Sequence, residues 1–443
     1  MEKSLIKSNQ NNSLSVKIFR YLPALKYRNF NLLFYGQSIS LIGTWMQTTA
    51  QSWLVLELTN SPFLLGLLGA VQFLPMMFFS FFAGVVADRF SKRKILLITQ
   101  SVLTLLALAL AVLSQIHIVE FWHVLVIGFF SGVANALDMP TRQSFFSEVV
   151  EKPALMNAIS LNSSIFNLAR IIGPAVAGIS IAKLGYAFCF YANAASFLPV
   201  IIGLSMIRPP KREGVIKGFR EDVFKEIREG IHYAFDKQII LLPLFLLLIV
   251  NIFALNFNVL VPVFVKEVLK RSADTYGNIL SIMGIGAILG STLLAVTSHR
   301  GVKDYYIFGG ATMLGASLVL FSFQERLFLT YLFIAFSGFM MVVFLNSINT
   351  TLQVNSEDGI RGRVMSFYSF VFGGLTPLGA LYAGSISEKF GASFSFRFSG
   401  LLVFSATILI YLFWYRKVFG NLFKREEEIT EAISSAPVNQ VKK

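Results

Sequence analysis

Few residues of this 443-residue chain could do chemistry in an apolar setting, because only 14% of them are charged. Four carboxylates lie near the ends of long apolar stretches: Glu57, Asp88, Glu120 and Asp138. A carboxylate whose pKa is raised by desolvation can take up and release protons inside a membrane protein. Asp138 and Glu57 are therefore candidates for this role at a shallow depth, unless protons on a bound molecule or another ion serve instead.

Arg170 is the one basic residue deep inside an apolar stretch, on one helical face with Ser163 and Asn167. A charge there costs at least about 2.5–3.5 kcal/mol, so Arg170 requires a partner or polar surroundings. Its guanidinium could contact an anionic group of a substrate or act as a gating charge. It could instead pair with Asp138, or with helix ends that hold one conformation. The sequence leaves both interpretations open.

Polar side chains recur along one face of four apolar stretches, at about 100° per residue. Against lipid these groups would lack hydrogen-bond partners, whereas a water-filled cavity would solvate them. Any single amide can instead form a hydrogen bond between neighbouring helices. As a set, we predict that they line a cavity; the candidates are Gln37, Thr44, Gln47, Gln51, Asn135, Arg170, Asn251, Asn258, Asn346 and Asn349.

The sequence motifs of common enzymes are missing. There is no G-x4-G-K-[ST] for nucleotide phosphates, no H-E-x-x-H for zinc and no G-x-S-x-G nucleophile elbow. The four His residues are scattered and Cys189 is the single cysteine, so neither a disulfide framework nor a clustered metal site is expected. We predict no enzyme activity, no metal and no cofactor.

The elements that must position these residues are long apolar helices. The chain is 55% hydrophobic with a mean hydropathy of +0.66, which excludes an ordinary soluble enzyme. About 20 apolar residues suffice to cross a hydrocarbon core of about 30 Å, and the runs are too long and too uniform for β-barrel strands. Twelve spans are predicted, at residues 31–57, 62–87, 95–115, 119–140, 158–182, 186–207, 239–265, 276–298, 304–323, 327–352, 363–387 and 393–415.

Lys and Arg are distributed unequally between the two sides of these spans. Thirty of the 38 lie in the terminal segments, the long central connector and the connectors of one side, and seven lie on the other. Because cytoplasmic segments carry the excess of positive charge, we predict a multi-pass protein of the cytoplasmic membrane with both termini in the cytoplasm. The net charge of +14 then indicates contact with anionic lipids rather than nucleic acid.

Composition divides the chain into five parts: a cytoplasmic N-terminal segment 1–29, a six-helix bundle 30–207, a cytoplasmic linker 208–238, a second six-helix bundle 239–415 and a cytoplasmic tail 416–443. In the linker, Phe219, Val223, Ile227 and Ile231 recur at helical spacing with charges between them. This pattern favours an amphipathic helix at the membrane surface, which is compatible with a simple linker between the bundles.

The two halves of the chain align without gaps over part of their length, at an offset of 206 residues. The matched pairs include Gly173 with Gly379, Gly178 with Gly384, Gly185 with Gly391, and Phe190 with Phe396. Such a parallel repeat predicts two bundles related by an axis along the membrane normal.

Between the second and third predicted spans the chain reads Gly84-Val-Val-Ala-Asp88-Arg89-Phe-Ser-Lys92-Arg93-Lys94. A glycine permits close helix contact, and an aspartate at a helix end can meet a neighbouring helix N-terminus or an arginine. The segment resembles the motif G-x3-D-R-x-G-x-R-K of the major facilitator superfamily, with Ser91 in place of the usual glycine. The resemblance implies an all-α membrane fold of twelve transmembrane helices in two pseudo-symmetric six-helix bundles, with a conformational-switch motif made of Gly84, Asp88, Arg89, Arg93 and Lys94.

Further motifs narrow this resemblance. The segments Asp138-Met-Pro140-Thr-Arg142, Asn167-x-x-Arg170-x-x-Gly173-Pro174 and Arg361-Gly362-Arg363 are similar to the bacterial exporter branch that includes the enterobactin exporter and macrolide-efflux-like proteins. The resemblance covers residues 25–415 and implies a secondary active exporter that moves a small amphipathic molecule, of siderophore or drug class, by alternating access. It also implies proton antiport and a monomeric protein.

Other functions remain open at this point. An importer or a lipid or lysolipid flippase could have the same fold. A polytopic membrane protein without transport activity would be favoured by catalytic acid–base pairs lining the cavity, and the sequence suggests none.

Overall fold

The computed structural model describes residues 22–207, 232–233, 235–297, 303–357 and 359–434, without the side chains of 80–89 and 414–434. Over these residues the chain is helical and contains no strand, which confirms the predicted all-α class. Most of the predicted amphipathic segment of the linker lies outside the described residues.

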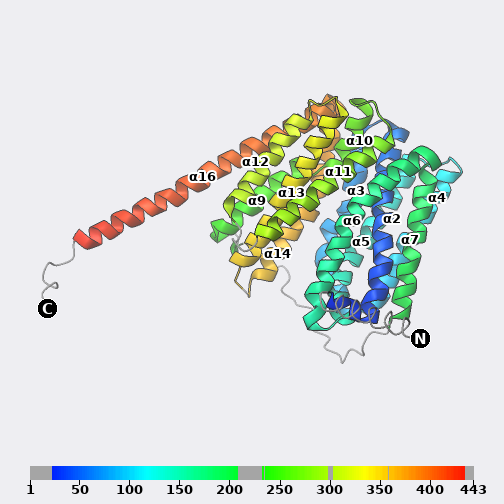
Figure 1. Ribbon diagram of the computed structural model, residues 1–443, viewed down its shortest axis with the longest axis horizontal. Coiled ribbons are helices and arrows are strands. Elements are labelled where there is room, and N and C mark those ends of the chain that lie inside the picture. The colour runs from blue at the N-terminus through cyan, green and yellow to red at the C-terminus, as the bar shows by residue number, and fades with distance from the viewer. Residues whose placement is uncertain (1–21, 208–231, 234, 298–302, 358, 435–443) are drawn as a thin grey trace, which may run out of the picture.

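The first half of the chain forms one bundle. A short 3-10 helix, η1 (Pro23–Lys26), precedes six long helices: α2 (Arg28–Thr59), α3 (Pro62–Arg89), α4 (Lys92–Gln115), α5 (Phe121–Val149), α6 (Lys152–Leu184) and α7 (Tyr186–Met206). Helix α2 packs against α6 and α7, α3 against α5, and α4 against α5 and α7 (Figure 1).

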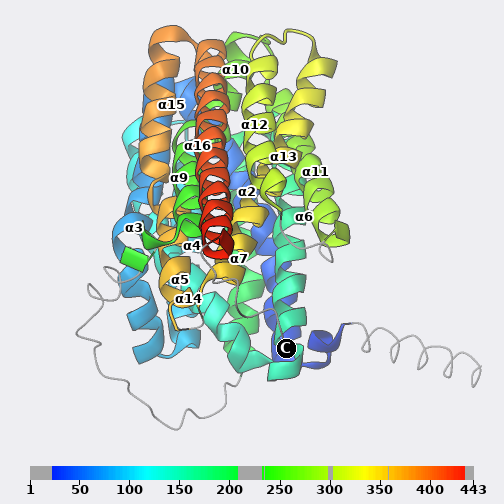
Figure 2. The ribbon, with the colours of Figure 1, turned by 90° about the vertical axis from the view of Figure 1, so that its left-hand side faces the viewer.

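The second half forms the other bundle from shorter pieces. They are α9 (Gln238–Phe253), α10 (Phe257–Glu267), α11 (Ala273–Thr297), α12 (Asp304–Phe321), α13 (Leu327–Asn355), α14 (Arg361–Ser369), the π-helical turn η3 (Phe370–Gly374), α15 (Thr376–Phe390) and α16 (Ala392–Ser434). Helix α12 packs between α13 and α16, and α13 also packs on α11. The last part of α16 projects from the bundle as a single long helix (Figures 1 and 2).

Eleven stretches of the described helices are long and apolar enough to cross a membrane. They combine α9 with α10 and α14 with α15, and α2 is the long helix that is not among them. The polar face predicted on the first span explains why α2 falls short in apolar character. Together with α2 the helices correspond to the twelve predicted spans.

Two predicted spans are interrupted. The seventh breaks at residues 254–256, where the amide of Asn256 donates to the carbonyl oxygen of Ile252 at 2.7 Å. The eleventh contains the π-helical turn η3, and the amide of Asn251 donates to the carbonyl oxygen of Val371 in that turn at 2.9 Å. A π-helical turn leaves backbone groups out of the regular ladder, so the hydrogen bond from α9 compensates for the irregularity.

The internal repeat has a direct structural counterpart. Gly185, between α6 and α7, and Gly391, between α15 and α16, have φ angles of 80° and 81°. Residues that carry a Cβ rarely adopt such a positive φ angle, so both turns require glycine. The paired Phe190 and Phe396, which follow these turns, are both fully buried. The two halves therefore use the same turn and the same anchor at equivalent positions.

The two bundles meet along two seams, α6 against α11 and α3 against α15. Gly178 lies against Gly277 in the first seam and Gly66 lies against Gly384 in the second, with no room for a side chain between them. These contacts lie at the end of the molecule that holds α10 and the start of α3, which we call the closed end. The ribbons diverge toward the opposite end, where α2 begins, which we call the open end (Figure 1).

Gly277→Ala tests the packing of the seam. A Cβ at this position would collide with the carbonyl oxygen of Pro174, so we expect a loss of about 1–3 kcal/mol in stability, measured by thermal unfolding of the detergent-purified protein. The matched control is Gly309→Ala in α12, where a Cβ meets nothing within 4 Å. Alanine there should be neutral or stabilise the helix by up to about 1 kcal/mol. Equal effects of the two substitutions would contradict a tightly packed seam.

Candidate functional site

Several predicted cavity residues are exposed although they lie within membrane-spanning helices. Asn135 on α5 and Asn346 on α13 are exposed, as is Asn258 on α10. Asn135 lies one turn before Met139 on the same face of α5, and Met139 lines a cavity of about 360 Å³ between α3 and α5 of the first bundle and α14 and η3 of the second. The face of α5 that carries Asn135 is thus turned toward the other bundle.

Other predicted cavity residues are held by hydrogen bonds inside the bundles. Gln47 accepts from the amide of Asn193 at 2.7 Å, which joins α2 to α7, and Asn251 is bound to η3. Thr44 donates to the carbonyl oxygen of Ser40 in its own helix. Gln51 is buried, with 4% of its surface exposed. Asn349 accepts from Gln353. Gln47 and Asn251 thus make hydrogen bonds between helices, the alternative that the sequence left open beside the cavity role.

Asp138 lies at the centre of a buried polar cluster in the first bundle. Its Oδ2 accepts from the Thr99 hydroxyl at 2.7 Å and from the Gln100 amide at 2.8 Å, both on α4. Its Oδ1 accepts from Arg142 Nε at 2.8 Å and lies 2.7 Å from Arg142 Nη2. Arg142 also donates from Nη1 to Gln37 Oε1 on α2. The Asp138 carboxylate therefore joins α5 to α4, and its partner Arg142 joins α5 to α2.

Helix α5 is longer than the predicted fourth span. The fourth span was predicted to end at residue 140, which placed Asp138 at a span end, but α5 continues to Val149. Asp138 is 6% exposed and lies within the helix. Helix α5 continues through Pro140. Thr99 and Gln100, which hold the carboxylate, could not be identified from the sequence because they lie on another helix.

Arg170 is not paired with Asp138 in this structure, because Arg142 occupies that carboxylate. Its Nε and Nη2 atoms are buried and have no hydrogen-bond partner among the described residues. One turn away, Phe166 packs edge-on against Trp45 of α2 at a centroid distance of 5.8 Å. Arg170 is thus a partly buried cation with two unpartnered nitrogens, in contrast to Arg142, which is bound to Asp138 and Gln37.

The basic motif after α3 is tied to the first bundle. Arg93 donates from Nε and Nη2 to the carbonyl oxygens of Leu204 and Ser205, both at 2.6 Å, and so caps the end of α7. Lys92 is 5% exposed and forms a 3.0 Å ion pair with Glu148 at the end of α5. Lys94 is exposed. The side chains of Gly84, Asp88 and Arg89 lie outside the described part of the chain.

At the closed end, polar contacts connect the bundles through helix termini. Glu388 at the end of α15 accepts from the Ser61 hydroxyl at 2.9 Å and from the Phe63 backbone N–H at 3.0 Å, which caps the start of α3. Lys266 at the end of α10 donates to the carbonyl oxygen of Leu56, near the end of α2, at 2.8 Å. An anion thus lies at a helix N-terminus and a cation at a helix C-terminus, as the helix dipole favours.

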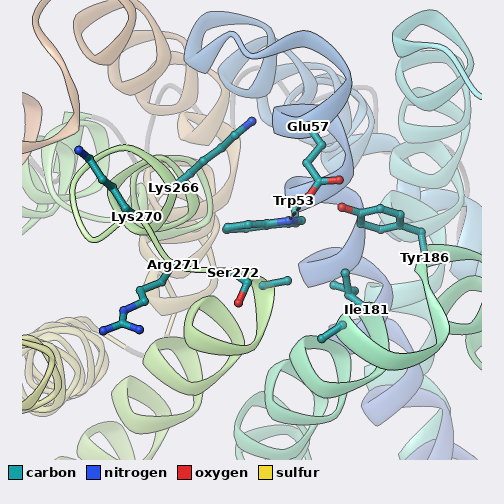
Figure 3. A pocket seen from close by; sticks show the side chains of 10 residues that line it. Trp53, Glu57, Ile181, Tyr186, Lys266, Lys270, Arg271 and Ser272 are labelled. Atoms are coloured by element: carbon teal, nitrogen blue, oxygen red, sulfur yellow. Dashed lines mark hydrogen bonds between the residues drawn. The ribbon is translucent and has the colours of Figure 1, made fainter.

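Glu57, the other coupling candidate, lies beside a pocket of about 640 Å³ at this end (Figure 3). Its Oε1 accepts from the indole N–H of Trp53 at 2.8 Å, and the hydroxyl of Tyr186 points toward it. Both bundles line the pocket, and the second contributes Lys266, Lys270 and Arg271. The residues that line the pocket thus include one carboxylate and three cations, of which Lys270 and Arg271 point away from Glu57 (Figure 3).

No group of three His, Cys, Asp or Glu side chains among the described residues could hold a metal ion. Cys189 is buried in the first bundle.

Sequence comparison agrees with this architecture. The profile of the transmembrane secretion effector family matches residues 21–440. The staphyloferrin A transporter of Staphylococcus aureus is 24% identical over 388 residues, which cover 85% of this chain and 94% of that protein. The multidrug efflux pump Tap of Mycolicibacterium fortuitum is 24% identical (80% and 88% coverage), and macrolide efflux protein A of Streptococcus pyogenes is 22% identical (87% and 96% coverage).

Solved structures share the fold at low sequence identity. A point mutant of the nucleoside transporter NupG superposes with a TM-score of 0.70 at 13% identity, over 86% of this chain and 99% of that one. A bacterial homologue of the human lysosomal transporter Spinster, inward-facing and unoccupied, gives 0.65 at 13% identity over 87% and 94% of the chains. The sequence-based identification of the superfamily and its fold is confirmed: the chain belongs to the transmembrane secretion effector family of the major facilitator superfamily, whose members are transporters rather than enzymes.

Proposed function

We propose that this chain is a proton-driven secondary exporter that moves a small amphipathic organic molecule, of siderophore or drug class, by alternating access. The observation that carries the proposal is the asymmetry of the two seams. Glycine contacts and helix-end hydrogen bonds join the bundles at the closed end, while polar side chains such as Asn135 and Asn346 are exposed within the membrane-spanning helices.

The contacts at the closed end suit a reversible seal. Glu388, Lys266 and Ser281 each make hydrogen bonds across the seam, the last to the carbonyl oxygen of Ile171 at 2.6 Å. Hydrogen bonds of this kind contribute only about 0.5–1.5 kcal/mol each, because water can replace either partner. The bundles can therefore separate at this end without unfolding either one, which alternating access requires.

Asp138 is the carboxylate best placed for proton coupling. Its carboxylate receives four donor contacts, two of them from Arg142, and Arg142 in turn donates to Gln37, so loss of the negative charge would free Arg142 and with it the contact to Gln37. Because Gln37 lies on α2 and Thr99 on α4, a change in the charge of Asp138 alters contacts between three helices. Glu57 is the weaker candidate, since its contacts lie at the closed end alone.

The cargo class and the direction rest on family and relatives. One relative is a staphyloferrin A transporter and others are multidrug or macrolide efflux proteins, which favours export of siderophore-like or drug-like molecules. The distribution of Lys and Arg places the open end and both termini in the cytoplasm, with anionic lipids around the basic segments. We further propose a bundle boundary at the linker 208–238 and a monomeric transporter.

Transport is tested in inside-out vesicles from an efflux-deficient bacterial strain that expresses the chain. With the vesicle interior acidified, at least one member of a panel of siderophores and antibiotics should accumulate at least about threefold above vesicles without the protein. A protonophore should abolish the difference. Accumulation that ignores both gradient and protonophore would rule out antiport, and accumulation in right-side-out vesicles instead would indicate import.

Coupling is tested with Asp138→Asn. This variant should lose at least about tenfold of gradient-driven accumulation, since the side chain can no longer titrate. It also leaves Arg142 unpaired in a buried site, at a cost of about 3–5 kcal/mol in stability.

The double variant Asp138→Asn/Arg142→Gln separates folding from coupling. It removes both charges, so the midpoint temperature of thermal unfolding should return toward that of the unmodified protein. Gradient-driven transport should stay lost. Thr99→Ser keeps the hydroxyl donor and serves as the control with normal transport. Full gradient response in Asp138→Asn would exclude Asp138 as the coupling residue.

A further inference from the structure

Arg170 lies where the two bundles part. On its closed-end side, Ile171 packs so tightly on α11 that a Cβ at Gly284 would lie 2.7 Å from its Cγ1. On its open-end side, Ser163 is exposed and Asn167 is partly exposed. Residues 163, 167 and 170 share one face of α6. Along this face Arg170 lies farthest from the open end, and the exposed Ser163 lies nearest to it.

The guanidinium of Arg170 is partly enclosed by the protein. Its Nε and Nη2 are enclosed without a hydrogen-bond partner, and among the described residues no carboxylate oxygen lies within 4 Å of its nitrogens. Arginine stays protonated in proteins, so its neutral form offers no relief from burial. A buried cation of this kind is stabilised by an anion that arrives with a ligand.

The other charges near the seam are of both signs, with cations in excess among the residues that line the closed-end pocket. Asp138 is neutralised by Arg142, and Glu388 caps α3. Further along α6, Ile181 lines the closed-end pocket, where Lys266, Lys270 and Arg271 outnumber Glu57 (Figure 3). Eleven residues separate Arg170 from Ile181, which is about 16 Å along a helix. Two positions of excess positive charge therefore follow one another along α6.

We propose that the cargo is an amphipathic organic anion, with a carboxylate or similar oxyanion bound by Arg170 and its apolar part against Phe166 and Trp45. The planar guanidinium can hold such a group through two parallel N–H···O bonds. Phe166 is 41% exposed, which leaves aromatic surface available one turn from the charge. The cationic closed-end pocket would then receive the same anion on its way out. This inference rests on the proposed export function and narrows its cargo.

The charge of the cavity can be measured without knowing the cargo, because Cys189 is the single cysteine and is buried. In a Cys189→Ala background, Asn167→Cys places a thiol one turn from Arg170. Its reaction rates with the anionic sulfonatoethyl and the cationic trimethylammonioethyl methanethiosulfonates are compared, with and without Arg170→Gln. A unit charge about 6 Å away should shift the anion-to-cation rate ratio by about tenfold even in water.

Two controls keep the measurement specific. Arg170→Lys retains the charge and should keep the ratio. Ser147→Cys, exposed near the open end of α5, should give a ratio that Arg170→Gln leaves unchanged. The midpoint temperature of thermal unfolding of Arg170→Gln should be no lower than that of the unmodified protein, since an unpartnered charge is removed. A marked loss of stability would indicate a structural pairing and overturn the proposal.

Cargo charge is tested with two dyes that share one ring system, anionic fluorescein and cationic rhodamine 123, in the inside-out vesicles described above. Fluorescein should be accumulated preferentially, and Arg170→Gln should reduce that preference at least fivefold. Equal or better transport of rhodamine, with a preference that Arg170→Gln does not change, would overturn the proposal.

If neither dye moves, the thiol rate ratio decides: a ratio that Arg170→Gln leaves unchanged overturns the inference, and a tenfold shift supports it. The siderophore and antibiotic panel decides separately whether the chain exports. Failure of the export proposal and failure of the anion inference are therefore distinguishable.

Discussion

The architecture depends on how the two bundles are joined at the closed end. Gly66 against Gly384 and Gly178 against Gly277 bring helix backbones into direct contact, and this proximity lets Glu388 reach the start of α3 and Lys266 reach the end of α2. In a membrane there is no hydrophobic driving force to press helices together, so close packing and hydrogen bonds must hold them. Small residues are therefore a condition for the polar contacts beside them.

The first bundle illustrates two outcomes for charges inside a membrane helix. Asp138 and Arg142 are neighbours at positions i and i+4 and satisfy each other, with Thr99, Gln100 and Gln37 completing their bonds. Arg170 is left with two enclosed nitrogens and no such shell. The unpartnered nitrogens of Arg170 beside the paired Asp138 and Arg142 are the contrast on which our proposal of an anionic cargo rests.

Much of the fold was predictable from the sequence, because membrane helices and positive charge leave strong one-dimensional signals. The spans, the repeat and the motif after the second span all rely on spacing within a segment. Gly185 and Gly391 are the best example, since a repeat offset of 206 paired two turns that prove to have the same φ. The break at 254–256 and the π-helical turn η3 left no such signal, because each depends on hydrogen bonds to other groups in the fold.

The site was less predictable, because a polar helix face can either line a cavity or form hydrogen bonds to a neighbouring helix. Gln47 and Asn135 lie on faces predicted in the same way, yet Gln47 joins α2 to α7 and Asn135 is exposed. Only the neighbouring helix distinguishes them, and its identity is a property of three-dimensional packing.

The seal between the bundles also explains why the closed-end charges are arranged as they are. Lys266 binds a backbone carbonyl oxygen beside Glu57, whose Oε1 accepts from Trp53, so the seal uses a helix end rather than an ion pair. An ion pair buried between bundles would leave two charges uncompensated on separation, at a cost of several kcal/mol. A lysine on a helix C-terminus loses only a hydrogen bond that water replaces. Such a seal suits the alternating access that we propose.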